Sequence, residues 1–100
     1  MKEVIDKLNK AFENRIRLGI MSALMVNDSI DFLTIKELLD VTDGNLASHI
    51  TALEKLSYIN VKKEFVGKKT RTLFTVTALG RREFNNHLNA LEKLVKRNRK

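Results

Sequence analysis

The sequence predicts a mainly α-helical domain with one small antiparallel β-hairpin, an α+β fold formed by residues 1–100 as a single unit. Three observations predict it. Apolar residues recur at intervals of three and four through most of the chain, as they do on one face of a helix. From Tyr58 the interval changes to two, which indicates strands. Finally, 100 residues, of which 43% are hydrophobic and 31% charged, suffice for one modest core.

Two helices are expected before residue 30. The residues that predict an N-terminal helix by their spacing are Val4, Ile5, Leu8 and Phe12. The pattern restarts at Arg15 and ends near Asn27. This second stretch is apolar on nearly all sides, so we expect a helix enclosed by its neighbours, with Met21 and Met25 in the core.

A short helix is then predicted to start at Ile35. Thr34 and Glu37 have the spacing of a capping box, in which each side chain accepts a hydrogen bond from an otherwise unpaired backbone N–H. Leu33 and Leu38 have the spacing of the hydrophobic staple that accompanies such a cap.

Another helix is predicted after a minimal turn. Thr42 is expected to cap it, and Asp43 puts a negative charge on its first turn, where the helix dipole favours one. Val41 and Leu46 again have the spacing of a staple. Two capped helices joined in this way, over residues 34–56, are the sequence pattern of a helix-turn-helix.

Residues 58–77 are predicted to form the hairpin. A register that pairs Val66 with Arg71 keeps the apolar side chains of both strands on one face, because a slip of one residue would set them opposite threonines. This register leaves a four-residue end with two lysines at its tip, Gly67-Lys68-Lys69-Thr70.

Thr77 is expected to cap a last helix over residues 78–98, with a seam of apolar residues at spacings of four, three and four. Twenty helical residues span about 30 Å. Such a helix can cross a small domain and still offer a stripe to a partner, which predicts a homodimer. The residues expected at the dimer interface are Val4, Leu8, Phe84, Leu88, Leu91 and Val95. Burial of the seam within its own subunit is the alternative.

The net charge of +7 is unevenly distributed. Residues 1–50 carry six Lys/Arg and eight Asp/Glu, whereas residues 51–100 carry thirteen and four. This asymmetry predicts a polyanionic partner, either nucleic acid or an anionic membrane surface. A membrane is disfavoured because the basic residues lie on a hairpin rather than on the polar side of an amphipathic helix. We therefore expect double-stranded DNA as the partner.

The helix over residues 43–56 is the candidate for reading DNA bases. Its predicted inward residues are Leu46, Ala47, Ile50 and Leu53, and its outward residues are Asn45, Ser48, Ala52 and Lys55. The outward face is small, polar and free of acids, which suits the major groove. Asn45 is the first candidate for a base contact, because an asparagine amide pairs well with adenine, and Ser48 is the second. A bond from Asn45 to its own backbone is the alternative.

Contacts to the DNA backbone are expected mainly from the hairpin. Lysines at an exposed tip would bind phosphates and supply affinity rather than sequence choice. The residues expected to contact the backbone are Thr42, Lys55, Lys68, Lys69 and Arg71, of which Arg71 could enter the minor groove. A charged edge that discourages strand-to-strand aggregation is an alternative that does not exclude DNA.

At this point the chain resembles the winged-helix DNA-binding transcriptional regulators, near the MarR-like and ArsR-like groups. The resemblance covers residues 14–82 and rests on NRIRLGIM (14–21), LDVTDGNLASHI (39–50), LEKL (53–56), FVGKK (65–69) and TALGR (77–81). It implies a winged helix-turn-helix with N- and C-terminal dimerisation helices, in which the hairpin is the wing. It also implies a prokaryotic, homodimeric regulator.

His49 lies where ArsR-like recognition helices often carry a histidine, so the resemblance implies a contact to a base or a phosphate. Geometry alone equally allows a half-buried side chain against Leu56. The metal-sensing ArsR proteins are a poor match, since this chain has no cysteine and His87 is its only other histidine. We therefore expect no metal site and no cofactor, and the sequence identifies no small-molecule effector.

Other function classes are disfavoured. The chain has no nucleophile elbow, metal-ligand cluster or spaced carboxylate pair, so we expect no enzyme. Its longest uncharged apolar runs are about half the roughly 20 residues of a membrane span, and its start carries acids where a secretory signal is apolar. A cytoplasmic protein is expected. The alternative function is a winged-helix module for protein interaction or dimerisation without specific DNA binding, although such a surface would be expected to carry aromatic or arginine anchors.

Overall fold

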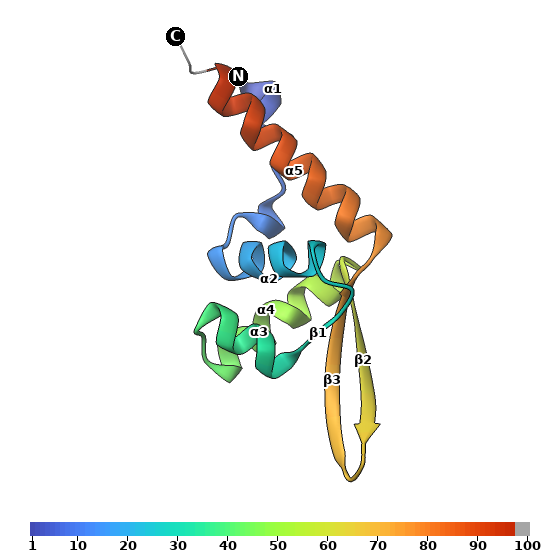
Figure 1. The fold of residues 1–100 in the computed structure, drawn as a ribbon. Helices are drawn as coiled ribbons and strands as arrows, with labels where there is room; N and C mark the ends of the chain where they lie inside the picture. The colour runs from blue at the N-terminus through green and yellow to red at the C-terminus, as the bar shows by residue number, and fades with distance from the viewer. Residues whose placement is uncertain (98–100) are drawn as a thin grey trace.

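A computed structural model describes residues 1–97 and confirms the α+β class (Figure 1). Its elements in chain order are α1 (Lys2–Ile5), the 3-10 helix η1 (Lys10–Phe12), α2 (Arg15–Met25), β1 (Ile30–Asp31), α3 (Phe32–Leu39), α4 (Asp43–Lys55), β2 (Ile59–Val66), β3 (Lys69–Val76) and α5 (Ala78–Arg97). The predicted end of the last helix at residue 98 lies outside the described residues. In Figure 1 the β2–β3 hairpin projects from one end of the molecule, and α1 lies beside the far end of α5.

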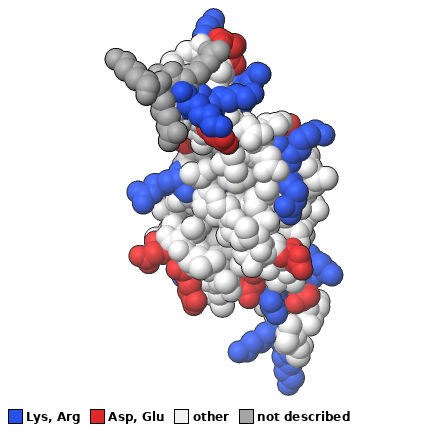
Figure 2. Space-filling model, turned by 45° about the horizontal axis from the view of Figure 1, so that its top comes forward, with Lys and Arg blue, Asp and Glu red and all other residues white. Residues whose placement is uncertain are grey.

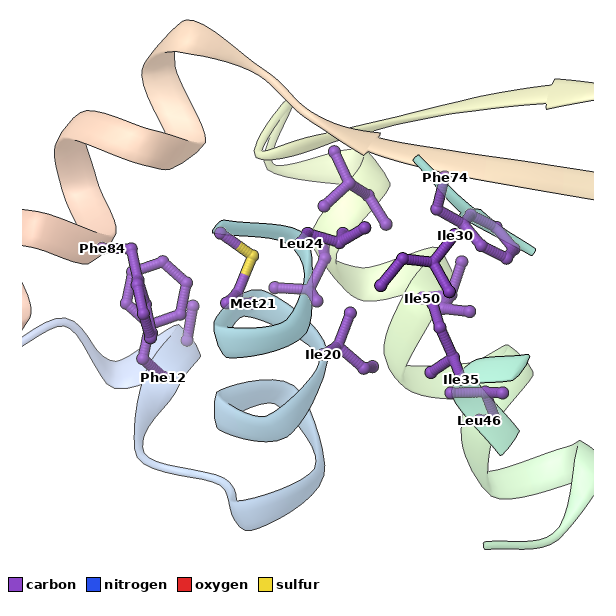
Figure 3. Packing of buried hydrophobic residues seen from close by; sticks show 13 residues of the cluster. Phe12, Ile20, Met21, Leu24, Ile30, Ile35, Leu46, Ile50, Phe74 and Phe84 are labelled. Carbon is purple, nitrogen blue, oxygen red and sulfur yellow. The ribbon is translucent and has the colours of Figure 1, made fainter. Parts of the chain in front are cut away.

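The hydrophobic core lies between the helices and the base of the hairpin, and α2 is at its centre, as its apolar pattern predicts. Ile20, Met21 and Leu24 of α2 are fully buried, whereas Met25 is half-buried. Figure 3 shows two groups of side chains on either side of α2. On one side Phe12 meets Phe84 edge-on, with ring centroids 5.1 Å apart. On the other side lie residues of α3, α4 and the sheet: Ile30, Ile35, Leu46, Ile50 and Phe74.

The N-terminal segment is not the continuous helix that its spacing predicts. Asn9 has an extended backbone, with φ −98° and ψ 118°, and separates α1 from η1. Its backbone N–H donates to His87 Nδ1 at 2.9 Å, and its side-chain amide donates to Tyr58 Oη at 2.9 Å. Its Oδ1 accepts from the N–H of Ala11. Tertiary hydrogen bonds therefore replace the helical ones at this residue.

Helix α3 starts at Phe32, three residues earlier than predicted. Its N-cap is Asp31, whose carboxylate accepts a hydrogen bond from the N–H of Thr34 at 2.8 Å. Thr34 is thus inside the helix, and the capping-box prediction is wrong. The predicted staple is also absent, because Leu33 and Leu38 are both exposed. The cap moves upstream because Asp31 ends β1, which pairs with β3 and fixes where the chain can turn into a helix.

The sheet has three antiparallel strands in the order β1-β3-β2. In the observed hairpin register Val66 pairs with Lys69, so the predicted pairing of Val66 with Arg71 is wrong by two residues. A shift of two leaves every side chain on its predicted face, which is why the apolar pattern alone did not distinguish the two registers. The turn contains only Gly67 and Lys68, and Gly67 adopts φ +66°, which glycine tolerates without steric cost.

Helix α5 begins at Ala78, as predicted. Thr77 caps it, with Oγ1 accepting a hydrogen bond from the N–H of Gly80 at 2.8 Å. The first turn of α5 lies directly on the turn between α4 and β2. A Cβ atom at Gly80 would be 2.1 Å from the carbonyl oxygen of Tyr58, so only glycine allows this approach.

Two of the residues predicted at a dimer interface belong to the subunit's own core. Val4 is 6% exposed and Phe84 is 2% exposed, so neither is available to a partner and this part of the prediction is wrong. Leu8 is half-buried. The remaining three, Leu88, Leu91 and Val95, are exposed and form a stripe along α5 at spacings of three and four. The burial of Phe84 follows from its contact with Phe12, which the spacing of the seam did not reveal.

Candidate nucleic-acid interface

The second helix of the helix-turn-helix, α4, presents most of the side chains that the sequence assigned to DNA. Thr42 caps it, with Oγ1 accepting from the N–H of Asn45 at 3.2 Å. The inward residues that anchor α4 on the core are Leu46, Ile50 and Leu53. Asn45, Ser48 and Lys55 are exposed on the outward side.

Two alanines of α4 depart from the predicted faces. Ala47, predicted inward, is exposed, and Ala52, predicted outward, is half-buried. The buried face of α4 is thus narrower and rotated toward the side that carries His49. Since both residues are small, the strip formed by Asn45, Ser48 and Lys55 stays free of bulky groups and contains no acid, whereas Glu54 is exposed on the same side as Ala47, at the edge of this strip.

His49 is half-buried and is held by a residue that sequence reasoning missed. Its Nδ1 accepts a hydrogen bond from Arg17 Nε of α2 at 3.0 Å. Burial, and then the nearby Arg17 charge, lower the pKa of His49 below its ordinary value of 6.5. The ring is therefore neutral at pH 7, with its proton on Nε2. No buried side-chain nitrogen or oxygen of the described residues lacks a partner, so Nε2, which has none, reaches solvent. Thirty-two residues separate this pair, and no sequence signal joins them.

The turn between α3 and α4 is fixed by local contacts. Asp40 ends α3 in the left-handed conformation, with φ 51° and ψ 56°, which aspartate tolerates better than most residues. Lys36 Nζ then pairs with Asp43 Oδ1 at 2.7 Å across the turn. This exposed ion pair joins α3 to the first turn of α4.

The hairpin brings lysines to the end of the molecule farthest from the termini. Lys68 lies in the turn and Lys69 directly follows it, and both are exposed. Figure 2 shows basic side chains, Lys or Arg, around this projecting end, while the middle of the same face is largely uncharged. The hairpin as a whole carries Lys62 and Lys63 as well, against Glu64 as its acid. The tip is therefore a compact positive surface.

Arg71 is also exposed, but unlike the tip lysines it is paired with acids. Its guanidinium lies between two carboxylates, with Nε 3.4 Å from Asp31 Oδ2 and Nη1 3.8 Å from Glu64 Oε1. These pairs link all three strands of the sheet. Arg71 thus has ion-pair partners within the sheet, and its contact with DNA stays a prediction.

A helix-turn-helix whose second helix presents a polar strip, beside a projecting basic hairpin, defines a winged helix-turn-helix. This class of domain places its second helix in the major groove of DNA. The part of the chain described by the structure contains no helix long and apolar enough to span a bilayer. Nor does that part contain a group of three His, Cys, Asp or Glu side chains that could hold a metal ion.

Comparison with known proteins agrees with this class. Residues 16–95 match the family model of the winged helix DNA-binding domain. The chain therefore belongs to the winged helix DNA-binding domain family, which confirms the resemblance seen in the sequence. It is 31% identical over 87 residues to an uncharacterized protein of Methanocaldococcus jannaschii, covering 87% of this chain and 95% of that protein.

Solved structures share the fold over nearly the whole chain. A transcriptional regulator homologue from Pyrococcus horikoshii OT3 superposes with a TM-score of 0.86 at 31% identity, covering 96% of each chain. The YusO protein of Bacillus subtilis gives a TM-score of 0.77 at 15% identity, covering 96% of this chain and 70% of that protein. The second likeness concerns the fold alone.

Proposed function

We propose that this protein is a transcriptional regulator that binds specific double-stranded DNA as a homodimer and acts by binding, without catalysing a reaction. One observation carries the proposal: the acid-free strip of Asn45, Ser48 and Lys55 on α4 and the exposed lysines of the hairpin tip belong to one small domain. Membership of the winged helix DNA-binding domain family supports it. So does the 31% identity to the Pyrococcus horikoshii protein named as a transcriptional regulator homologue.

In this proposal α4 reads bases in the major groove. The Asn45 amide can donate and accept at one adenine, and the Ser48 hydroxyl adapts to either role. His49 acts only as a donor through Nε2–H, because Arg17 occupies Nδ1. It therefore favours an acceptor, such as guanine O6 or N7, thymine O4 or a phosphate oxygen. Arg17 positions this donor without touching DNA itself.

Backbone contacts come from both ends of α4 and from the hairpin tip. The Thr42 hydroxyl accepts from Asn45 N–H and keeps its own proton for a phosphate at the helix N-terminus, where the dipole favours an anion. Lys55 supplies a charge at the other end of the helix. Lys68 and Lys69 bind phosphates beside the adjacent groove and supply most of the salt dependence.

The homodimer forms through the apolar stripe of α5, namely Leu88, Leu91 and Val95. A twofold axis at this end of the molecule keeps the interface away from α4 and sets two recognition helices about 34 Å apart, one turn of DNA. We expect a sedimentation mass of two chains for the native protein and of one chain for Leu91→Lys. Leu33→Lys, at an exposed leucine of α3, is the matched control and should remain dimeric. A native mass of one chain at micromolar concentration refutes the dimer.

The DNA-binding proposal is tested with random-sequence duplex DNA across a salt series. Each phosphate contact contributes about 0.9 to the slope of log affinity against log salt, so Lys68→Ala/Lys69→Ala should lower that slope by about 2. Lys2→Ala/Lys10→Ala removes the same charge from exposed lysines near the chain start and should leave the slope unchanged. If the native protein shows no salt slope, or both variants lower it equally, the proposal is wrong and an interaction module becomes the better description.

A further inference from the structure

The hairpin tip carries an exposed aromatic side chain that the phosphate contacts do not explain. Phe65 is 80% exposed, whereas Phe12, Phe74 and Phe84 are 1–2% exposed. It lies opposite Thr70 and one residue before Val66, at the end of β2. A single exposed apolar residue is common on protein surfaces, so its surroundings have to decide what it does.

The two faces of the hairpin differ in charge near Phe65. Side chains alternate along a strand, so Phe65 shares the face of Ile59 and Val61, which pack on the core at the hairpin base. Toward the tip this face continues as Lys63 and Phe65, without an acid. Glu64 lies on the opposite face, where it pairs with Arg71. The aromatic ring is thus on the acid-free side.

The position of Phe65 suits a base step better than a phosphate. Lys68 follows it in the turn and Lys63 shares its face, so phosphates bound by these lysines would hold the ring close to the groove between them. Proteins that contact the minor groove often insert an apolar side chain between base pairs and kink the duplex. The two-residue turn makes a narrow tip, which the minor groove of about 6 Å requires.

We propose that Phe65 inserts from the minor groove between stacked base pairs and bends the bound DNA. This proposal rests on the proposed DNA binding. It adds a second source of sequence preference, because pyrimidine–purine steps such as TA unstack most easily. Sites with such a step under the hairpin tip are therefore bound more tightly, although no hydrogen bond reads that step.

The test compares Phe65→Ala with Phe65→Leu and with Val66→Ala. Val66 is an exposed apolar neighbour on the other face of the same strand and serves as the matched control. Each protein is added at saturation to a duplex about three helical turns long that contains TA steps and carries a dye at each end. Energy transfer between the dyes measures bending, and permanganate oxidation of thymines measures unstacking.

We expect the native protein and Val66→Ala to raise both signals. Phe65→Ala should lose both and bind about tenfold more weakly, which is within the range for losing one aromatic contact to a base. Phe65→Leu should keep part of the bend, because leucine can also act as a wedge. The substituted side chain is exposed, so thermal unfolding of Phe65→Ala should match that of the native protein.

The outcomes separate this inference from the proposed function. If Phe65→Ala bends and unstacks DNA like the native protein while Lys68→Ala/Lys69→Ala weakens binding, the wedge is wrong and DNA binding stands. If Phe65→Ala instead lowers the sedimentation mass and leaves bending intact, the ring contacts protein and the wedge is again wrong. If the native protein binds no duplex, both proposals fail.

Discussion

The helical body and the hairpin of this protein use apolar residues in opposite ways. In the body Phe12, Met21 and Phe84 are enclosed by other side chains. Along β2 the exposure rises from a buried Ile59 at the base to an exposed Phe65 near the tip. The helical body therefore determines the stability of the fold, and the hairpin tip offers surface to a partner. Variants at the two ends should change different measurements.

The largest loss of stability is expected for Phe12→Ala. Its ring contacts Phe84, Tyr58 and His87, so truncation leaves a cavity where three elements meet. We expect the free energy of unfolding to fall by about 3–5 kcal/mol, as measured by urea denaturation. The same change at Phe65 should lower it by less than about 0.5 kcal/mol. Equal losses at the two sites would show that the contrast between body and hairpin is wrong.

Gly80→Ala should be the next most harmful change. The new methyl group would overlap the Tyr58 carbonyl, a backbone atom that cannot move aside without shifting α5. A loss of about 1–3 kcal/mol in unfolding free energy is expected, measured in the same way. Gly44→Ala is the control, because a Cβ there meets no atom within 4 Å and alanine favours a helix. If Gly80→Ala is as stable as Gly44→Ala, the close approach of α5 does not exist in solution.

The free energy of unfolding should also decrease as the pH falls, because of His87, which links α5 to the N-terminal segment. Burial lowers the pKa of His87 below its ordinary value of 6.5, and the Glu13 carboxylate partly opposes this. The unfolded chain then binds more protons than the folded one as the pH falls below 6.5 toward the folded pKa. The contribution of neutral His87 to the free energy of unfolding is fully present above pH 6.5 and is lost as the pH falls through the folded pKa.

Thermal unfolding at a series of pH values measures this effect. The melting temperature of the native protein should fall between neutral and mildly acidic pH, and His87→Gln should show a smaller fall. His49→Gln is the control for the other histidine with a lowered pKa, and it should keep the His87 part of the dependence. An unchanged pH profile in His87→Gln would contradict the assignment.

A smaller loss is expected for Asp31→Ala, which lies between the two regions. Its carboxylate caps α3 and pairs with Arg71. Loss of an N-cap lowers the free energy of unfolding by about 1 kcal/mol, and a half-exposed ion pair adds little. Asp31→Asn keeps the cap and loses the charge, so urea denaturation of both variants separates the two contributions. A larger loss in Asp31→Asn than in Asp31→Ala would overturn the capping role.

The smallest effect on stability is expected at the hairpin tip. Lys68→Ala/Lys69→Ala changes two exposed side chains and should alter the free energy of unfolding by less than about 0.5 kcal/mol. Its effect should be on DNA affinity instead. A clear loss of stability in this variant would show that the lysines support the fold and would weaken their assignment to phosphates.

Much of the site could be predicted because its signals are local. Thr42 and Thr77 cap helices where the sequence placed them, and the exposure of Asn45 and Ser48 follows from the helical period of α4. The start of α3 could not be predicted in this way. Asp31 and Thr34 are both acceptable caps, and the pairing of β1 with β3 decides between them.

By itself the sequence determined the order of the helices from α2 to α5 and of the two hairpin strands, the polar strip of α4 and the concentration of lysines in the hairpin, because these depend on periodicity, caps and composition. Only the tertiary structure decided the rest. It joined Arg17 to His49, placed Arg71 between two acids, and turned Phe84 inward against Phe12. Each of these contacts joins residues of different helices or strands, whereas a spacing rule describes only neighbours along one helix or strand.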